Sequence, residues 1–502
     1  MSPVSATATA QPVVLLRGAL AASWPLVALT ALAAGLRFST LDLQSLWYDE
    51  AFTPVHVLHP GLVATLRSVV HTENTPPLWY LLEWGISRLL GTGAISLRLL
   101  SALAGAASVP VAWGIGQELS GRRAAMAAAA FTAVSPLFVW YSQEARAYAL
   151  FVLLAALAML CFLRAEREPT PGRMAAFALS SSLALLTHYF ALFLLVPMMV
   201  ILAWRPDRRR LAAPAIGAIV GVGLALAPLI SAQGGHGTQW IGQWALSGRL
   251  QAIPQYYLLG YSGAPLGRGL ELLVALPILT GVAFGLWRVL TPREERGALI
   301  ALAIAAGGIL LPTLLLALGA DYLAPRNLVA AMIPVSALIA VVVTARRTGR
   351  VGVAFAVTIV IALLAITIDV DLSPRLQRGN WRGVARALGR GAPDRVITTV
   401  ELGAAPLEYY IPPLHNLPRG ASVTVDEIDE IGYAPLRPGA GSPPAPGFRL
   451  LDRLDINGLI VYRFVSTLPR TLAEAALRRR VITLAHPEVL VAPSARPGRT
   501  RS

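Results

Sequence analysis

The residues best suited to chemistry lie in the stretch LWYDEAFTPVH, where Asp49 and Glu50 stand side by side after a long apolar segment. Neighbouring side chains project about 100° apart on a helix and to opposite faces of a strand, so these carboxylates do not form a matched pair. We expect one to face a site and the other to cap or orient a helix, since acidic side chains favour helix N-termini. The alternative is that both cap a solvated helix.

Two further motifs place ionisable groups next to apolar segments. In HTENTPP, a capped turn accounts for the asparagine and the prolines but not for Glu73. In WYSQEARAY, the residues Glu144, Arg146 and Tyr148 fall between two apolar segments. Ionisable groups at membrane depth are costly to leave unpaired, so they are candidates for function. An ion pair within this loop is the alternative for Glu144 and Arg146.

Two basic side chains complete the candidate set. His188 falls at a predicted turn, where it serves either as a ligand or as an interfacial anchor. Arg326, in GADYLAPRN, stands where an apolar segment begins. A guanidinium there suits a phosphate oxyanion near the lipid headgroups. The alternative for Arg326 is an anchor whose head reaches the membrane surface.

The composition indicates that these residues belong to a membrane protein. The chain is 55% hydrophobic and only 14% charged, whereas soluble domains carry about a quarter charged residues. Its net charge of +15 comes from arginine alone, in short clusters between apolar segments. Positive-inside topology explains such clusters better than a nucleic-acid surface. The single Cys161 excludes an internal disulfide framework.

Eleven apolar segments are candidates for membrane-spanning helices. They cover residues 19–36, 99–115, 124–141, 147–163, 174–187, 189–204, 211–230, 270–287, 298–318, 328–344 and 351–368. The arginine clusters fall in alternate loops, which we therefore expect to be cytoplasmic. The N-terminus is then cytoplasmic, and residues 37–96 and everything after 368 lie outside.

The segment PPLWYLLEWGISRLLG, residues 76–91, decides whether the number of spans is odd or even, and so on which side of the membrane the later loops lie. It is short, opens with two prolines and carries Glu83 and Arg88. We interpret it as an amphipathic interfacial helix in the first outer loop, with Trp79, Tyr80 and Trp84 in the aromatic belt. A twelfth span here would move all later arginine clusters outside.

Past residue 369 the composition becomes that of a soluble domain, rich in Gly, Pro, Asp and Arg. We expect a helix over 380–390, strands over 395–400 and 458–465, and a helix opening at 406–410, typical of a small α/β domain. The predicted organisation is a transmembrane catalytic domain over 1–369 and an extracytoplasmic domain over 370–502. Residues after 494 are expected to be a disordered tail. This outer-facing polar site does not by itself distinguish an enzyme from a transporter.

Several motifs in order resemble the GT-C glycosyltransferases. These are WYDE, PPLWYLLEW, SLRLLSAL and GRRAAMAAAAFTAVSPLFVWYSQEARAYAL, with a weaker match at YLAPRNLVAAMIPV. The branch they resemble is the bacterial family 39 type, akin to protein O-mannosyltransferases and the lipid A aminoarabinose transferase. The resemblance implies a GT-C fold of about eleven transmembrane helices, in a bacterial plasma membrane.

The resemblance also implies an activity and roles for the candidates. A sugar would move from a polyprenyl-phosphate carrier in the bilayer to the hydroxyl of a lipid, glycan or protein, with inversion. Asp49 would be the general base and Glu50 part of the same acidic motif. Arg146 and Arg326 would neutralise the leaving phosphate, and Glu73, Glu144 and His188 could hold sugar hydroxyls.

Some features stay open at the level of sequence. Where the aminoarabinose-transferase branch has an aspartate in the second outer loop, this chain has Glu144 and Tyr148, so its donor is not fixed. A divalent metal held by Asp49, Glu73 and His71 is possible, although we favour no metal and no other cofactor. The rival function is a transporter or flippase of a lipid-linked glycan, and a non-catalytic scaffold is a further alternative. Charge gathered in outer loops, without inverted repeats, argues against the transporter.

Overall fold

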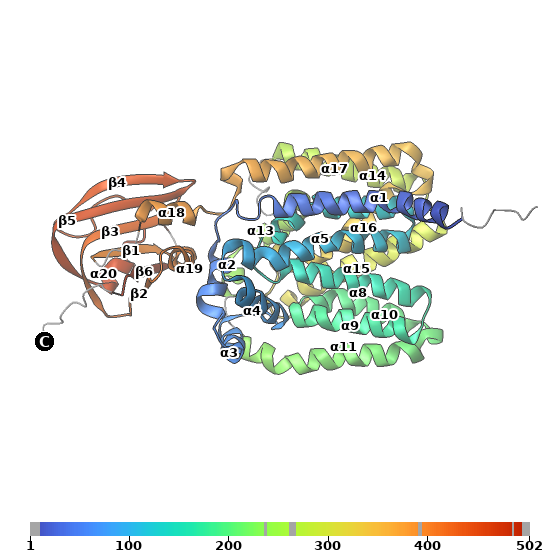
Figure 1. Ribbon diagram of the computed structural model, residues 1–502, viewed down its shortest axis with the longest axis horizontal. Helices are drawn as coiled ribbons and strands as arrows, with labels where there is room; N and C mark the ends of the chain where they lie inside the picture. Colours follow the sequence, from blue (N-terminus) through green and yellow to red (C-terminus); the bar gives the residue numbers. More distant parts are fainter. Residues whose placement is uncertain (1–10, 235–237, 261–267, 390–393, 484–485, 494–502) are drawn as a thin grey trace, which may run out of the picture. The chain divides into compact units, whose positions relative to one another are not determined.

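The computed structural model describes residues 11–234, 238–260, 268–389, 394–483 and 486–493 (Figure 1). The tail expected to be disordered lies outside these residues. The chain divides into two compact units. The first comprises Met1–Leu41, Val69–Gly85 and Arg98–Asp369, and the second comprises Asp42–Ser68, Ile86–Leu97 and Val370–Ser502.

The first unit consists of long helices that run side by side (Figure 1). They are α1 (Gln11–Phe38), α5 (Ala94–Leu119), α6 (Arg122–Val134), α7 (Pro136–Ser142), α8 (Tyr148–Arg167), α9 (Pro171–Thr187), α10 (Ala191–Trp204), α11 (Pro206–Gln233), α14 (Arg268–Trp287), α15 (Pro292–Ala317), α16 (Met332–Val343) and α17 (Gly349–Leu372). Shorter elements are α12 (Gln239–Gln243), α13 (Leu246–Leu259), η3 (Pro325–Ala331) and η4 (Arg346–Thr348). The residues of α3 (Leu62–Thr72) and α4 (Leu78–Leu90) are divided between the first and the second unit.

Among the described residues, six helices are long and apolar enough to cross a membrane, or seven if the bent pair α6 and α7 is one span. Every one of the eleven apolar segments predicted from the sequence lies in a helix or a pair of consecutive helices, to within two residues at its ends. The multi-pass helical architecture is therefore established. The number eleven stays a prediction, because several of these helices are shorter than a full span.

The segment with the two prolines forms α4, a helix of 13 residues. It is not among the helices that are long enough to span. The expected aromatic belt is wrong for two of its three members, because Trp79 and Tyr80 are 0% and 1% exposed. Their rings pack inside the protein, where burial of a large aromatic surface outweighs an interfacial position.

A proline breaks the helix that the segment 124–141 was expected to form. The axes of α6 and α7 differ by 54° at Ser135 and Pro136. Proline has no N–H to donate to the carbonyl four residues earlier, which is that of Thr132. The buried Arg37 replaces this donor: its guanidinium donates to the Thr132 and Ala133 carbonyls, at 3.2 and 2.9 Å.

The same guanidinium reaches α7 through a gap left by a glycine. Arg37 Nε donates to Ser142 Oγ at 3.1 Å. A Cβ at Gly105 of α5 would come within 1.9 Å of Ser142 Oγ and 2.8 Å of Arg37 Nε. Only a residue without a side chain fits there, so Gly105 and Arg37 together hold α1, α5, α6 and α7 in place.

The second unit contains a six-stranded sheet in the order β2-β6-β1-β3-β5-β4. The strands are β1 (Arg395–Val400), β2 (His415–Asn416), β3 (Ser422–Tyr433), β4 (Phe448–Ile456), β5 (Leu459–Ala473) and β6 (Pro487–Val491), with α18 (Trp381–Leu388), α19 (Glu401–Tyr410) and α20 (Glu474–Arg478). β1 and β3 are parallel and joined through α19, and the other pairs are antiparallel. The expected α/β domain is present.

The sequence missed β3 because acidic residues interrupt its apolar alternation. Asp429 on β3 is fully buried. Its carboxylate forms ion pairs with two arginines: Oδ2 lies 3.1 Å from Nε of Arg395 on β1, and Oδ1 lies 3.2 Å from Nε of Arg463 on β5. These arginines come from the strands on either side of β3. They compensate the buried charge of Asp429 only when the three strands lie together, so the sequence alone does not show why an acidic strand is stable.

We expect the Arg37→Met variant to lower the apparent melting temperature of the detergent-solubilised protein by several degrees. The substitution leaves two buried carbonyls without their donor, at about 1–3 kcal/mol each. The Arg123→Met variant, at an exposed position of α6, is the control and should melt like the wild type. Equal melting of both variants would show that Arg37 does not hold the helix break.

Candidate functional site

The acidic pair lies on a short helix of the second unit. α2 (Tyr48–Phe52) carries Asp49 and Glu50 and continues into the π-helical turn η1 (Thr53–Val57). The wider turn follows from Pro54, which has no N–H for the carbonyl of Glu50. The N–H of Leu58 donates to the Thr53 carbonyl, five residues earlier, at 2.9 Å, which is the hydrogen bond of a π-helical turn. Such π-turns are frequent at functional sites.

Burial separates the two carboxylates. Glu50 is 0% exposed, and its Oε2 accepts the N–H of Trp47 at the start of α2, at 3.4 Å. The same oxygen lies 3.7 Å from Nε of Arg378. Asp49 is partly exposed. The structure therefore leaves Asp49 accessible and gives Glu50 a helix-capping position inside the unit.

In the first unit, Glu73 and Arg146 form a two-pronged ion pair. Arg146 Nη1 donates to Glu73 Oε1 at 3.1 Å and Nη2 donates to Oε2 at 2.8 Å. The Glu73 side chain is 3% exposed and that of Arg146 is 13% exposed. The ion pair of Arg146 with Glu144, the alternative from the sequence, stays a prediction. Fork geometry fixes the guanidinium plane as well as its position.

Two residues that the sequence did not connect with Glu73 hold its carboxylate and the turn around it. The Tyr80 hydroxyl donates to Glu73 Oε2 at 2.6 Å, and burial raises the pKa of Tyr80 well above its usual range. Gln233, at the end of α11, donates to the carbonyls of Val69 and Thr75, both at 3.0 Å. These contacts fix the turn on both sides of Glu73, so the carboxylate is presented by a rigid loop.

His188 lies in a cage of aromatic rings between α9 and α10. Its ring stacks on Phe151 at 4.6 Å between centroids and lies 6.0 Å from Tyr148. Nδ1 accepts the backbone N–H of Phe190 at 3.2 Å, so the proton of the neutral ring resides on Nε2. Among the described residues, no hydrogen-bond partner of this Nε2–H is recorded.

Electrostatics keep His188 neutral. Burial, together with the positive charges of Arg326 and Arg146, lowers its pKa from 6.5 to about 3. The three side chains therefore share one region of the first unit. Arg326 is placed by the indole ring of Trp240, 4.6 Å from its guanidinium. This region is positive and offers a neutral N–H donor, which suits an anionic oxygen.

The two remaining candidates flank this region within α7, α8 and their turn. Glu144 is 1% exposed. The ring of Tyr148 lies 4.8 Å from that of Tyr141. The first unit thus brings together Glu73, Arg146, Tyr148, His188 and Arg326, from segments far apart in the sequence. Asp49 and Glu50 belong to the second unit.

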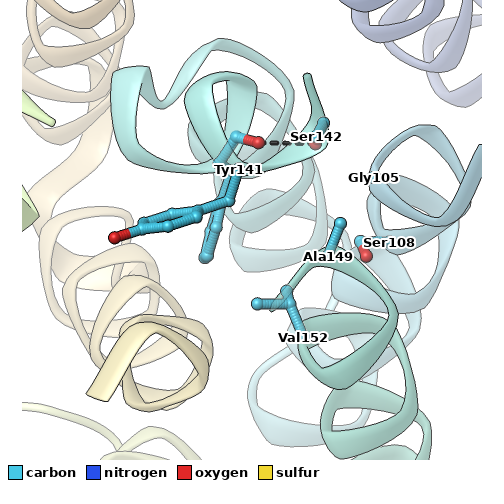
Figure 2. Close-up of a pocket in the computed structure, with 7 residues that line it drawn as sticks. Gly105, Ser108, Tyr141, Ser142, Ala149 and Val152 are labelled. Carbon is cyan, nitrogen blue, oxygen red and sulfur yellow. Dashed lines mark hydrogen bonds between the residues drawn. The ribbon is translucent and has the colours of Figure 1, made fainter. Parts of the chain in front are cut away.

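A cavity of about 10 Å³ lies beside these residues, lined by Gly105, Ser108, Phe138, Tyr141, Ser142, Ala149 and Val152. The Ser142 hydroxyl donates to the Phe138 carbonyl. Figure 2 shows the Tyr141 hydroxyl pointing away from Ser108. This volume suits one water molecule. It is too small for a sugar.

The described residues contain no group of three or more His, Cys, Asp or Glu side chains arranged to hold a metal. The three residues of the possible metal set are divided between the units, with Asp49 in the second and His71 and Glu73 in the first. The expectation that no metal takes part stays a prediction.

A family model described as dolichyl-phosphate-mannose-protein mannosyltransferase matches residues 74–231. This segment contains Glu144, Arg146, Tyr148 and His188. A comparison with curated proteins found no match.

Two solved structures of ArnT show the fold. The apo crystal structure of ArnT from Cupriavidus metallidurans is similar with a TM-score of 0.52 and 15% identity, over 78% of this chain and 85% of that chain. The structure of ArnT bound to undecaprenyl phosphate has a TM-score of 0.52 and 14% identity, over 88% of this chain and 98% of that chain. The oligosaccharyltransferase from Archaeoglobus fulgidus, tethered to an acceptor peptide, has a TM-score of 0.43 and 15% identity, over 78% of this chain and 59% of that chain. The expected resemblance to GT-C glycosyltransferases is confirmed, and the chain has a GT-C fold.

One further carboxyl on α4 is buried without a charged partner. Glu83 is 0% exposed, and neither carboxylate oxygen has a hydrogen-bond partner among the described residues. Burial raises its pKa from 4.5 to about 8. Between these two pH values the folded protein holds a proton that the unfolded chain releases, so stability falls as the pH rises.

We therefore expect the Glu83→Gln variant to gain stability over the wild type progressively from about pH 5 to pH 8 and then to level off. Melting temperatures of the two proteins, measured across this range, test it. The Glu295→Gln variant, at an exposed position, should show no such trend. A gain from Glu83→Gln that is the same at every pH would contradict a protonated Glu83.

Proposed function

We propose that this chain is an inverting glycosyltransferase that moves a sugar from a polyprenyl-phosphate donor to a hydroxyl acceptor. The observation that carries the proposal is the family match over 74–231, because that segment holds Arg146 and His188 of the positive region. The fold shared with ArnT, a protein solved with undecaprenyl phosphate, supports the same donor class. The acceptor is a hydroxyl of a lipid, glycan or protein.

The proposed reaction begins at Asp49. Its partly exposed carboxylate takes the proton from the acceptor hydroxyl, which then attacks the anomeric carbon from the face opposite the phosphate. The new glycosidic bond forms as the bond from the anomeric carbon to the phosphate oxygen breaks. The electron pair leaves on the carrier phosphate, so the anomeric configuration inverts.

The leaving phosphate needs positive charge that is already in place. Arg146 and Arg326 are suited to this role, because Glu73 and Trp240 hold their guanidinium groups. The Nε2–H of His188 adds a neutral donor that keeps its proton at every physiological pH. We assign Glu73 to the positioning of Arg146, since Arg146 and Tyr80 already occupy its oxygens.

The sugar itself would be held by the groups that remain. Glu144 and Tyr148 flank the positive region and can accept or donate hydrogen bonds to sugar hydroxyls. The chemistry above uses acid–base and ionic groups of the chain, and we propose that no metal takes part. The transporter alternative has no structural observation in its favour.

The proposed topology follows from the arginine clusters. The enzyme would lie in the plasma membrane with eleven spans, its N-terminus in the cytoplasm and its reaction on the outer face. Residues 1–369 would form the transmembrane catalytic domain and residues 370–502 the extracytoplasmic domain.

We expect the Asp49→Asn variant to lose transfer by at least about a hundredfold, because an amide cannot accept the hydroxyl proton. The measurement is sugar transfer in proteoliposomes that contain labelled polyprenyl-phosphate sugars and a panel of acceptors. The Asp42→Asn variant, at an exposed position of the same loop, is the control and should keep wild-type activity.

Two results would contradict the proposal. Wild-type rates from Asp49→Asn would remove Asp49 as the base. Wild-type protein that moves lipid-linked glycan across the vesicle membrane, but transfers no sugar from any donor, would favour the transporter.

The topology predicts which cysteines an impermeant reagent reaches in intact cells. In a Cys161→Ala background, Thr92→Cys should be labelled from outside, and Asp207→Cys only after the membrane is permeabilised. Both positions are exposed, so burial does not affect the outcome. The reverse pattern would mean that α4 crosses the membrane.

A further inference from the structure

The helix that carries Asp49 is embedded in contacts from the C-terminal part of the chain. Residues Asp42–Ser68 belong to the same compact unit as Val370–Ser502. α2 has only five residues. A helix of this length has no stability of its own, so its neighbours determine its orientation.

The first of these neighbours is Arg378, in the segment after α17. Its guanidinium lies 3.7 Å from the carboxylate of Glu50, and the two side chains are 2% and 0% exposed. The backbone N–H of Arg378 donates to Gln44 Oε1 at 2.9 Å. Gln377 donates to the last carbonyls of α17, at 3.3 Å to Val370 and 2.8 Å to Asp371. The backbone of Arg378 is therefore fixed by Gln44, and the residue before it is fixed to the end of α17.

The second neighbour is α19, which contacts the chain on both sides of Asp49. The hydroxyl oxygen of Tyr410 accepts the N–H of Leu46 at 2.8 Å. Oε2 of Glu408 lies 2.9 Å from Nε2 of His56, on the turn that follows α2. These contacts fall three residues before and seven residues after Asp49, so they hold both ends of its segment.

α19 is a rigid support for these contacts. Leu407 and Ile411, which directly precede Glu408 and follow Tyr410, are 0% and 4% exposed and belong to a hydrophobic core of the sheet domain. A Cβ at Gly403 of α19 would come within 2.4 Å of the Trp381 ring, so α19 and α18 pack without spare room. Movement of Glu408 or Tyr410 would disturb the core of the sheet domain.

We propose that Arg378, Glu408 and Tyr410 are positioning residues for Asp49, and that the C-terminal domain is thereby part of the catalytic apparatus. Arg378 acts through Glu50, which turns inward from the helix and leaves Asp49 as its accessible carboxylate. Small displacements of a general base reduce its efficiency steeply. This inference rests on the proposed function only for its effect on rate.

The test compares full-length variants by hydrogen exchange and by kinetics. We expect Arg378→Gln to speed amide exchange over Tyr48–Val57 by about tenfold or more, with exchange over Ser422–Tyr433 unchanged. The kcat for transfer should fall by about tenfold, and KM for the donor should change by less than about twofold. Arg378→Lys, which keeps the charge, should restore part of both.

Two further variants keep the test decisive. Arg386→Gln, at an exposed position of α18, is the matched control and should behave like the wild type. If Arg378→Gln does not fold, Tyr410→Phe removes a single hydroxyl and should speed exchange at Leu46, whose N–H loses its acceptor, and over Tyr48–Val57.

Unchanged exchange over Tyr48–Val57 in both Arg378→Gln and Tyr410→Phe would overturn the inference, whatever the rates. Faster exchange there with unchanged kcat would show that the contacts do not serve catalysis, and would overturn it too. A wild-type protein without transfer activity would refute the proposed function, but the exchange arm would still report whether the domain holds α2.

Discussion

A charged group removed from water is costly to leave without a partner inside the protein, and this constraint organises both compact units. Glu73 and Arg146 meet in a two-pronged pair, and Glu50 meets Arg378. At the end of α8, the buried Glu166 is held by Arg208 and Arg296 from two other helices. Replacing one member of such a pair strands the other, so each pair ties together segments that are distant along the chain.

The backbone obeys the same rule. Pro136 leaves carbonyls of α6 without their usual donors, and Arg37 supplies N–H groups to them. The Val134 carbonyl accepts the hydroxyl of Thr367 on α17 at 2.9 Å. A break that would destabilise an isolated helix thus becomes a junction of several helices. That junction begins the turn that carries Glu144, Arg146 and Tyr148.

Neutral and charged groups have different tasks in the positive region. Arg146 and Arg326 supply charge, while the aromatic cage and the field of these arginines keep His188 uncharged. Lone positive charges would repel each other on approach, so each needs its own support from Glu73 or Trp240. An arrangement fixed before substrate binds needs little reorganisation when charge develops on a leaving group.

The sequence by itself determined the helical membrane architecture, the α/β character of the C-terminal domain and the resemblance to GT-C glycosyltransferases. Apolar segment length and arginine clusters are local properties, so they can be read without coordinates. It could not find Tyr80 as a partner of Glu73 or Arg378 as a partner of Glu50. Only the tertiary structure shows that Glu50 is buried against Arg378 while Asp49 stays partly exposed, because burial and pairing depend on segments more than 300 residues apart, as Glu50 and Arg378 are.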